Sequence, residues 1–126
     1  MIKPPISPIP LPEAETYTEN WRNFNTTTML GAEPLSGYLA NAFTFDLADV
    51  TALMAESGIN QVRIYFGYDS PEPNAGTPLP MKVMLVGVDA QGNDMIDLSP
   101  EATTSGIYDF AVPCPSYCDA NSPLSS

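Results

Sequence analysis

Arg63 is the residue best suited to binding chemistry, because it is one of only four cations in the chain. It lies in the run VRIYFGYD, close to Tyr65 and Tyr68. A guanidinium group offers a planar fork of N–H donors that fits a carboxylate or a phosphate. Two interpretations follow. Arg63 pairs with an acid of its own fold, such as Asp69 or Asp109, or it forms a clamp with the tyrosines for an anionic small ligand.

A second polar group could bind a cation. Asp89, Asn93, Asp94 and Asp97 lie in and just beyond the glycine-containing turn DAQGND. Calcium takes oxygen ligands, and aspartates in such a turn supply several. The EF-hand pattern is not met, because the glycine is displaced and no glutamate follows at the twelfth position. A hairpin turn needs the same residue types, so the pattern favours a plain turn, with a weak calcium site as the alternative.

The two cysteines, Cys114 and Cys118, are separated by three residues. Structural zinc needs four ligands, which this pair could complete only by meeting a second copy, since the chain has no histidine. Redox-active C-x-x-C pairs have a shorter spacer and start a helix. The spacing therefore predicts either a small disulfide or two free thiols that hold the tail, and a reducing cytoplasm favours free thiols.

The charge balance excludes whole classes of function. Fifteen acids against four bases give a formal net charge of −11, which repels nucleic-acid phosphates and anionic lipid. The absence of histidine excludes Ser-His-Asp and Cys-His nucleophiles. An enzyme of this composition would depend on carboxylates and tyrosines, and the spacing of the acids points to no converging pair. A basic or cationic partner remains compatible with the charge.

The N-terminal sequence MIKPPISPIPLPE lacks the apolar run of a secretory signal, because prolines interrupt it. No apolar stretch reaches the roughly 20 residues that cross a bilayer. We therefore expect a cytoplasmic protein.

Two helices are predicted. The first covers residues 13–24, and its apolar face holds Ala14, Tyr17, Trp21 and Phe24. We expect Trp21 to anchor the core, with ligand stacking as the alternative. The second helix begins after an N-cap at Asp46 and ends near Gly58. Its apolar face comprises Leu47, Val50, Leu53 and Met54.

Two long strands are predicted, over residues 61–69 and 81–89. The second has apolar residues on both faces, which is typical of a central strand. Residues 95–98 are expected to return antiparallel to it. Shorter strands are expected within 38–45 and 106–112.

These elements predict a single α+β domain, in which a mainly antiparallel sheet of about four strands packs against two helices. Residues 1–12 form a Pro-rich extended arm, residues 13–112 the domain, and residues 113–126 an irregular tail that contains the cysteines.

The segments VRIYFGYD, LVGVDAQGND and YDFAVPCPSYC resemble those of small uncharacterised bacterial proteins of similar length. The resemblance implies the same order of elements. It implies no activity, cofactor or catalytic residue.

The lack of histidine, phosphate-binding loop and nucleophile motif predicts a non-enzymatic protein-interaction or self-assembly module, without cofactor. The partner is then another protein or a second copy. A small-ligand or cation-binding domain, which uses the Asp89–Asp94 turn or Arg63, is the alternative. A carboxylate-based enzyme is the third hypothesis.

Overall fold

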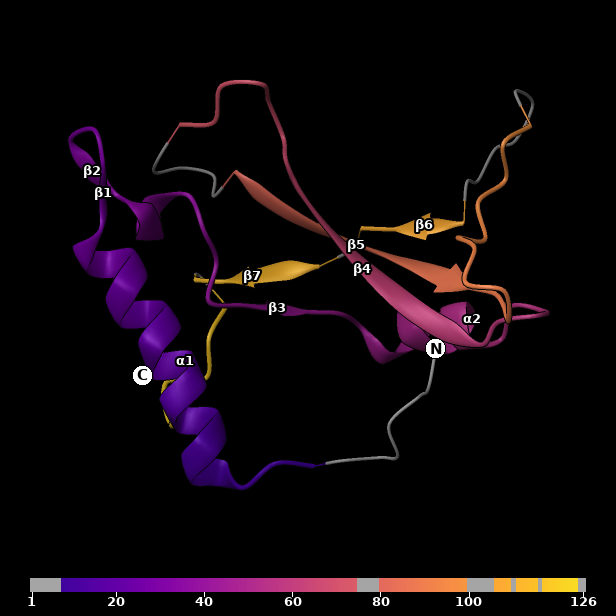
Figure 1. Cartoon of the computed structure of the whole chain (residues 1–126), viewed down its shortest axis with the longest axis horizontal. Coiled ribbons are helices and arrows are strands. Elements are labelled where there is room, and N and C mark those ends of the chain that lie inside the picture. Colours follow the sequence, from indigo (N-terminus) through magenta and orange to yellow (C-terminus); the bar gives the residue numbers. More distant parts are fainter. Residues whose placement is uncertain (1–7, 75–79, 100–105, 110, 116, 125–126) are drawn as a thin grey trace.

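The structure is a computed structural model that describes residues 8–74, 80–99, 106–109, 111–115 and 117–124. Its elements follow the chain in a simple order (Figure 1). They are α1 (Leu11–Thr27), β1 (Met29–Leu30), β2 (Glu33–Pro34), the 3₁₀ turn η1 (Leu35–Gly37), β3 (Ala42–Thr44), α2 (Leu47–Met54), β4 (Gln61–Tyr68), β5 (Met81–Val88), β6 (Ile107–Tyr108) and β7 (Val112–Cys114).

The predicted α+β class and antiparallel pairing are confirmed. The strands form three small sheets, β4-β5-β6, β3-β7 and β1-β2, where we had expected one sheet of about four strands. The strand predicted within 38–45 is shorter, as β3, and pairs with β7 at Phe43 and Pro113. A short strand makes few ladder hydrogen bonds, so its partner is set by tertiary contacts that periodicity does not encode.

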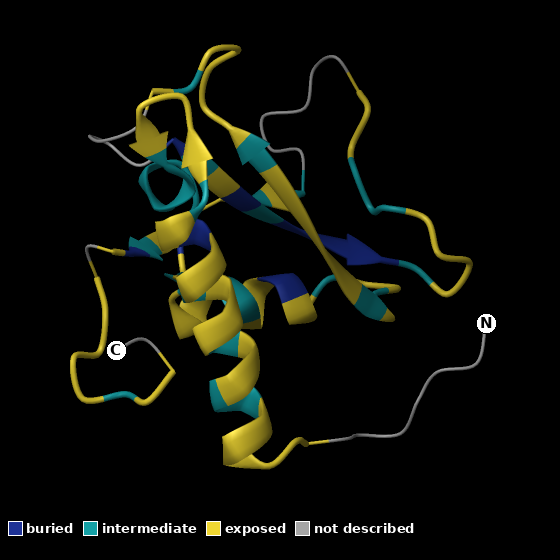
Figure 2. Cartoon of the chain, turned by 60° about the vertical axis from the view of Figure 1, so that its left-hand side comes forward, coloured by how far each residue is buried: buried dark blue, intermediate teal, exposed yellow. Residues whose placement is uncertain are grey.

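The two long strands are confirmed and form the main ladder. β4 pairs with β5 from Gln61 opposite Val88 to Tyr68 opposite Met81. β5 is the central strand, because β6 pairs with its other edge. Its buried side chains dominate the core of the described residues (Figure 2): Val83, Leu85, Val86 and Val88.

The antiparallel return predicted for residues 95–98 is confirmed only at its start and is shorter than predicted. The chain bonds back to β5 only at the start of this segment, where Asp94 bridges Val88 and the Met95 N–H donates to the Gly87 carbonyl at 2.8 Å. Residues 95–99 then run without regular structure. The edge of β5 farther along is already paired with β6, so it has no free ladder positions there.

The second helix packs mainly through a single residue, and much of its predicted apolar face stays exposed. Leu53 is 1% exposed, whereas Leu47 and Met54 are 79% and 64% exposed. Asp46 is the N-cap residue, as predicted, although its side chain makes no capping hydrogen bond. Gly58 has the predicted positive φ, 88°, after the helix ends. The helix packs against β5, and Tyr108 of β6 donates a hydrogen bond to Glu56 just beyond it.

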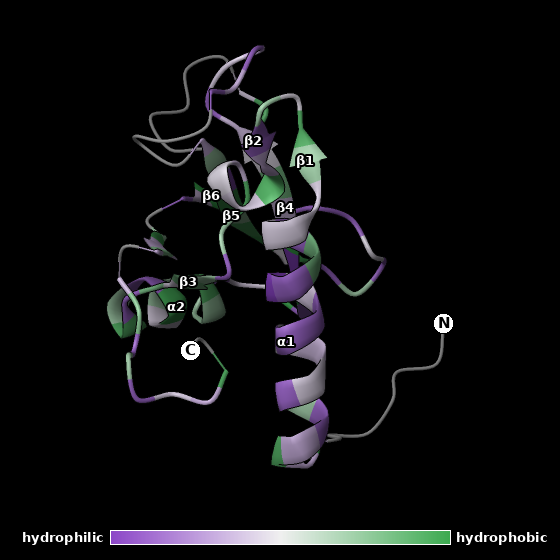
Figure 3. Ribbon diagram, turned by 90° about the vertical axis from the view of Figure 1, so that its left-hand side faces the viewer, coloured by the Kyte–Doolittle hydropathy of each residue, from purple (hydrophilic) through white to green (hydrophobic). Residues whose placement is uncertain are grey.

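The first helix lies apart from the main ladder, so the expectation that Trp21 anchors the core is wrong (Figure 1). Trp21 is 41% exposed, and Tyr17 and Phe24 on the same face are more exposed still. α1 contacts η1 and β2 instead of β5. Hydrophilic residues line most of α1 (Figure 3), so its narrow aromatic stripe does not draw it onto the sheet. Neither described helix is long and apolar enough to span a membrane.

The ends of the chain differ in part from the predicted boundaries. Most of the Pro-rich arm, residues 1–7, lies outside the described residues, and α1 begins at Leu11 because Pro12 is compatible with the first turn. The tail predicted to be irregular from Pro113 starts within β7.

The packing predicts unequal effects of two identical substitutions in α2. Leu53→Ala removes a buried side chain and is expected to lower the free energy of unfolding by about 2 to 4 kcal/mol. Leu47→Ala, in the same helix but exposed, is the matched control and should change it by about 0.5 kcal/mol or less. Urea denaturation followed by circular dichroism measures both. Equal effects would contradict the packing of α2 on β5.

Candidate functional site

The two polar groups predicted as separate sites meet at one point. Arg63 Nη1 lies 2.5 Å from Asp94 Oδ1, and Arg63 Nη2 donates to the Gly92 carbonyl at 3.3 Å. Tyr65 Oη donates a hydrogen bond to Asp94 Oδ2. The alternation of β4 explains this arrangement, because Arg63 and Tyr65 are two residues apart and so share a face. The strand and the turn after β5 are therefore locked together by one carboxylate.

Asp94, and not Asp69 or Asp109, is the acid that Arg63 pairs with. Asp69 is six residues farther along an extended chain, a distance of about 20 Å. Asp94 is far in sequence but bridges Val88 at the end of β5, which brings it beside the start of β4. A hydrogen bond with Tyr65 and the charge of Asp94 raise the pKa of Arg63, so its guanidinium stays cationic.

Tyr68 does not join this cluster. It lies an odd number of residues from Arg63 and therefore faces the other side of the sheet. It is half exposed, opposite Met81. The structure therefore brings only Arg63 and Tyr65 of the predicted clamp together, both bonded to Asp94, and ligand binding by these residues stays a prediction.

The turn after β5 uses its carboxylates for its own backbone. Asp89 Oδ1 accepts hydrogen bonds from the N–H groups of Gln91 and Asn93, at 2.9 and 3.0 Å. Gly92 has φ 86°, which a glycine adopts readily. Asp97 lies apart and accepts from the Ser99 N–H at 2.9 Å. These contacts are those of a hairpin turn.

The predicted calcium ligands are thus divided among three tasks. Asp89 holds the turn, Asp94 holds Arg63 and Tyr65, and Asp97 bonds Ser99. Asn93 contributes its backbone and is exposed. Among the described residues no three His, Cys, Asp or Glu side chains are placed to hold a metal ion. Calcium binding stays a prediction, and no described contact favours it.

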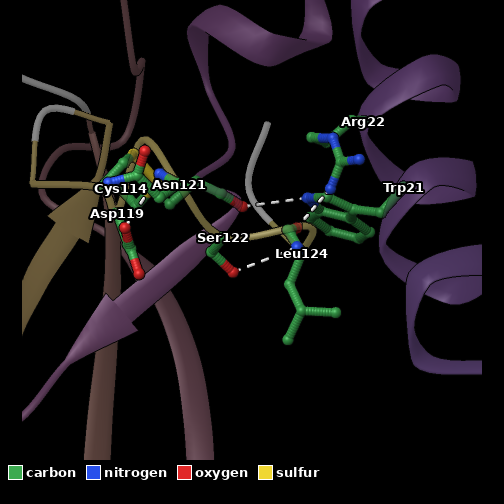
Figure 4. Close-up of a disulfide and its surroundings, with 9 residues drawn as sticks. Trp21, Arg22, Cys114, Asp119, Asn121, Ser122 and Leu124 are labelled. Atoms are coloured by element: carbon green, nitrogen blue, oxygen red, sulfur yellow. Dashed lines mark hydrogen bonds between the residues drawn. A yellow bond between two sulfur atoms is a disulfide. The ribbon is translucent and has the colours of Figure 1, made fainter. Parts of the chain in front are cut away.

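The cysteines form a disulfide, with Cα atoms 4.9 Å apart, which is one of the two predicted states; the free thiols favoured for a reducing cytoplasm are not formed. Cys114 is buried at the end of β7, and the chain beyond the bridge runs towards α1 (Figure 4). There Arg22 donates to the Leu124 carbonyl, and Trp21 Nε1 donates to the Ala40 carbonyl at 3.1 Å. These two bonds connect α1 to the C-terminal segment and to the segment before β3, while the bridge closes a short loop within the C-terminal segment.

Sequence reasoning did not single out the apolar residues on β4. α2 packs on β5 and leaves these β4 side chains largely exposed (Figure 2). We call this set the apolar row. Its members and their exposed fractions are Val62 (45%), Ile64 (53%), Phe66 (71%) and Tyr68 (50%).

Among the strands that the structure describes, none pairs with the backbone beside the apolar row. The Asp69 N–H donates to the Pro80 carbonyl at 3.1 Å, and this pair continues the register of Tyr68 and Met81. Hydrogen-bonded pairs alternate along an antiparallel ladder, so the odd-numbered residues of β4 bond to β5. The even-numbered residues, from Val62 to Tyr68, direct their N–H and C=O groups away from β5. We call this the outer edge of β4.

Within the part of the chain that the structure describes, β4 is an edge strand and no strand pairs with its outer edge. A pocket of about 270 Å³ lies elsewhere, over the Arg63 and Tyr65 face of the β4-β5-β6 sheet, and is lined by Tyr65, Phe66, Met84, Val86, Ile96 and Ile107. Edge strands are commonly protected from pairing by lysines, prolines or bulges. β4 contains no lysine or proline and pairs with β5 without interruption.

Catalytic chemistry finds little support in the described residues. Asn25 is the only buried polar residue among them, and no described carboxyl group is buried. General acid–base catalysis by carboxylates requires environments that set their pKa values apart. The described carboxyl groups are exposed or half-buried.

The comparisons with known proteins found no match, whether against family models, curated proteins or solved structures. The resemblance to small bacterial proteins therefore stays a prediction.

The cluster at Asp94 predicts a difference between two aspartates of the same segment. Asp94→Ala removes the acceptor of both Arg63 and Tyr65, so we expect a melting temperature lower by a few degrees. Asp97→Ala is the matched control and should change it by about 1 °C or less, because Asp97 is exposed and bonds only a neighbouring backbone N–H. Differential scanning calorimetry at low salt measures both. Equal melting temperatures would show that the bonds of Asp94 to Arg63 and Tyr65 contribute nothing to stability.

Proposed function

We propose that this protein is a non-enzymatic interaction module that binds a protein strand along the outer edge of β4. The observation that carries the proposal is the coincidence of an unpaired edge with an exposed apolar row. An added strand gains backbone hydrogen bonds from the edge, and its alternate side chains gain apolar contact with the row.

The charge around β4 supports the same proposal. β4 carries one charge, Arg63, and Asp94 neutralises it. An incoming strand therefore meets backbone and apolar groups without the need to desolvate a free charge, which would be costly. Because the net charge of −11 repels phosphates and anionic lipid, we propose a protein partner in preference to nucleic acid or membrane.

The apolar row also explains why a partner would bind with measurable affinity. Apolar area removed from water contributes about 25 cal/mol per Å². Phe66 and Tyr68 have the large side chains of the row, and aromatic groups are enriched at interfaces. Burial of apolar area has no preferred direction, so the backbone hydrogen bonds would set the direction and register of the bound strand.

The proposal predicts that β4 selects extended peptides. A random-peptide library on phage is panned against the protein, which is immobilised so sparsely that two copies cannot meet. We expect enriched peptides to alternate apolar and polar residues, as a strand with one buried face does. Their binding should fall at least about tenfold on the double variant Ile64→Lys with Phe66→Lys, because two charges would then lie in the contact.

The matched control is Leu47→Lys with Met54→Lys, which adds the same charge at exposed apolar positions of α2. It should bind the selected peptides as the unaltered protein does. Peptides that bind both double variants equally, or no enrichment at all, would contradict the proposed function.

The compartment is part of the proposal. The sequence predicted a cytoplasmic protein, but a disulfide persists where thiols are kept oxidised. The bridge between Cys114 and Cys118 leads us to propose that the protein works in an oxidising compartment instead.

This revision predicts the state of the cysteines in the cell. If native cells are quenched in acid and treated with an alkylating reagent before reduction, Cys114 and Cys118 should both stay unmodified. Mass spectrometry of the tryptic peptides measures this. Alkylation of both thiols would contradict the proposed oxidising compartment and indicate a reducing one.

A further inference from the structure

We infer that the strand bound at the outer edge of β4 is β4 of a second copy of this chain, paired antiparallel about a twofold axis at Tyr65. This inference rests on the proposed function and names its partner. The pairing would join two three-stranded sheets into one continuous sheet. A twofold contact of this kind uses the same patch on both copies, so the patch must complement itself.

The backbone of the outer edge complements itself in one register. The outward-facing residues are all even-numbered, so they must pair with even-numbered residues of the second copy. If Tyr65 lies on the axis, Val62 pairs with Tyr68 of the second copy, and Ile64 pairs with Phe66. All four outward residues of each copy are then used, which gives about eight backbone hydrogen bonds. An axis at Ile64 would leave Tyr68 without an even-numbered partner inside β4.

The side chains agree with this register on both faces. On the face of the apolar row, Phe66 lies opposite Ile64 of the second copy, and Tyr68 lies opposite Val62. Aromatic and β-branched pairs of this kind stabilise adjacent strands. On the other face, Arg63 lies opposite Gly67 of the second copy, which has no side chain to collide with it.

Charge decides between a second copy and a basic peptide. A basic peptide would need acids along the contact, and residues 61–68 contain none. In the proposed register Asp69 lies opposite Gln61 of the second copy, and the Asp94 carboxylate beside Tyr65 is paired with Arg63 of its own copy. The repulsion between two chains of charge −11 remains, but it acts over distances that salt screens beyond about 8 Å at physiological ionic strength. Self-association should therefore strengthen as salt is added, whereas binding of a basic peptide would weaken.

The decisive measurement is amide hydrogen exchange of the unaltered protein, read by NMR at about 10 μM and about 1 mM. The outward amides of Ile64 and Phe66 should exchange at least about tenfold more slowly at the higher concentration. The inward amides of Arg63 and Tyr65 bond to β5 in either state and serve as the internal control. Sedimentation should show a dimer at the higher concentration, and more of it at about 0.5 M than at 0.05 M sodium chloride.

Cross-linking tests the register. Residues on the axis of a non-hydrogen-bonded pair have Cα atoms about 4.5 Å apart, which a disulfide can bridge. Tyr65→Cys should therefore form a covalent dimer through residue 65 under mild oxidation, as shown by peptide mapping. Ala52→Cys, at an exposed position of α2, is the control and should not. Ile64→Lys with Phe66→Lys should abolish the dimer, and Leu47→Lys with Met54→Lys should leave it intact.

Four results would overturn the inference. They are a monomer at about 1 mM with fast exchange at Ile64 and Phe66, protection of these amides in a protein that sediments as a monomer, a dimer that leaves them unprotected, and a dimer that survives both lysines in β4. If the protein is a monomer with fast exchange but still selects peptides on the sparse surface, the second copy is not the partner. The proposed function would then still hold. Failure of the selection as well would remove both.

Discussion

The β4–β5 ladder is the constraint on which the rest of this structure depends. Eight residue pairs run without a bulge from Gln61 opposite Val88 to Tyr68 opposite Met81. This register places β5 in the centre, where its side chains make most of the core. It also turns the even-numbered backbone of β4 outward and leaves the apolar row at the rim. A slip of one residue would exchange the faces, move Arg63 away from Asp94 and bring charge into the core.

The contact of Arg63 with Asp94 and Tyr65 links this ladder to the proposed function. It fastens the turn after β5 to the start of β4 and neutralises the only charge on the strand. An unpaired cation there would attract an acid and resist burial beneath an incoming strand. The same carboxylate that explains why the turn is a poor cation site therefore explains why the edge is suited to pairing. The contact of Arg63 with Asp94 thus weakens the hypothesis of a cation site at the turn and strengthens the hypothesis of strand pairing at the edge of β4.

The distribution of apolar surface points the same way. Seven hydrophobic residues make the core of the described chain, while larger side chains such as Trp21, Phe24 and Phe66 stay exposed. A chain of this length buries about two-thirds of its unfolded surface, and a small core leaves it little stability to spare. α1 is connected to the fold by the η1 contacts and the bonds of Trp21 and Arg22. Burial of the apolar row by a second chain would add to the same core that β5 begins.

Local pattern determined several features of this protein. The patterns over residues 61–69 and 81–89 identified both long strands to within one residue, apolar residues on both faces identified β5 as central, and turn chemistry identified the hairpin at Gly92. Capping signals placed the start of α2 at Asp46. These are properties of residues close together in the chain, so a single sequence carries them. Tertiary structure alone decided which acid Arg63 bonds, which side of β4 stays open, and that Trp21 lies outside the core. Each of these depends on which surface packs against which, and an apolar residue has the same periodicity whether or not another element covers it.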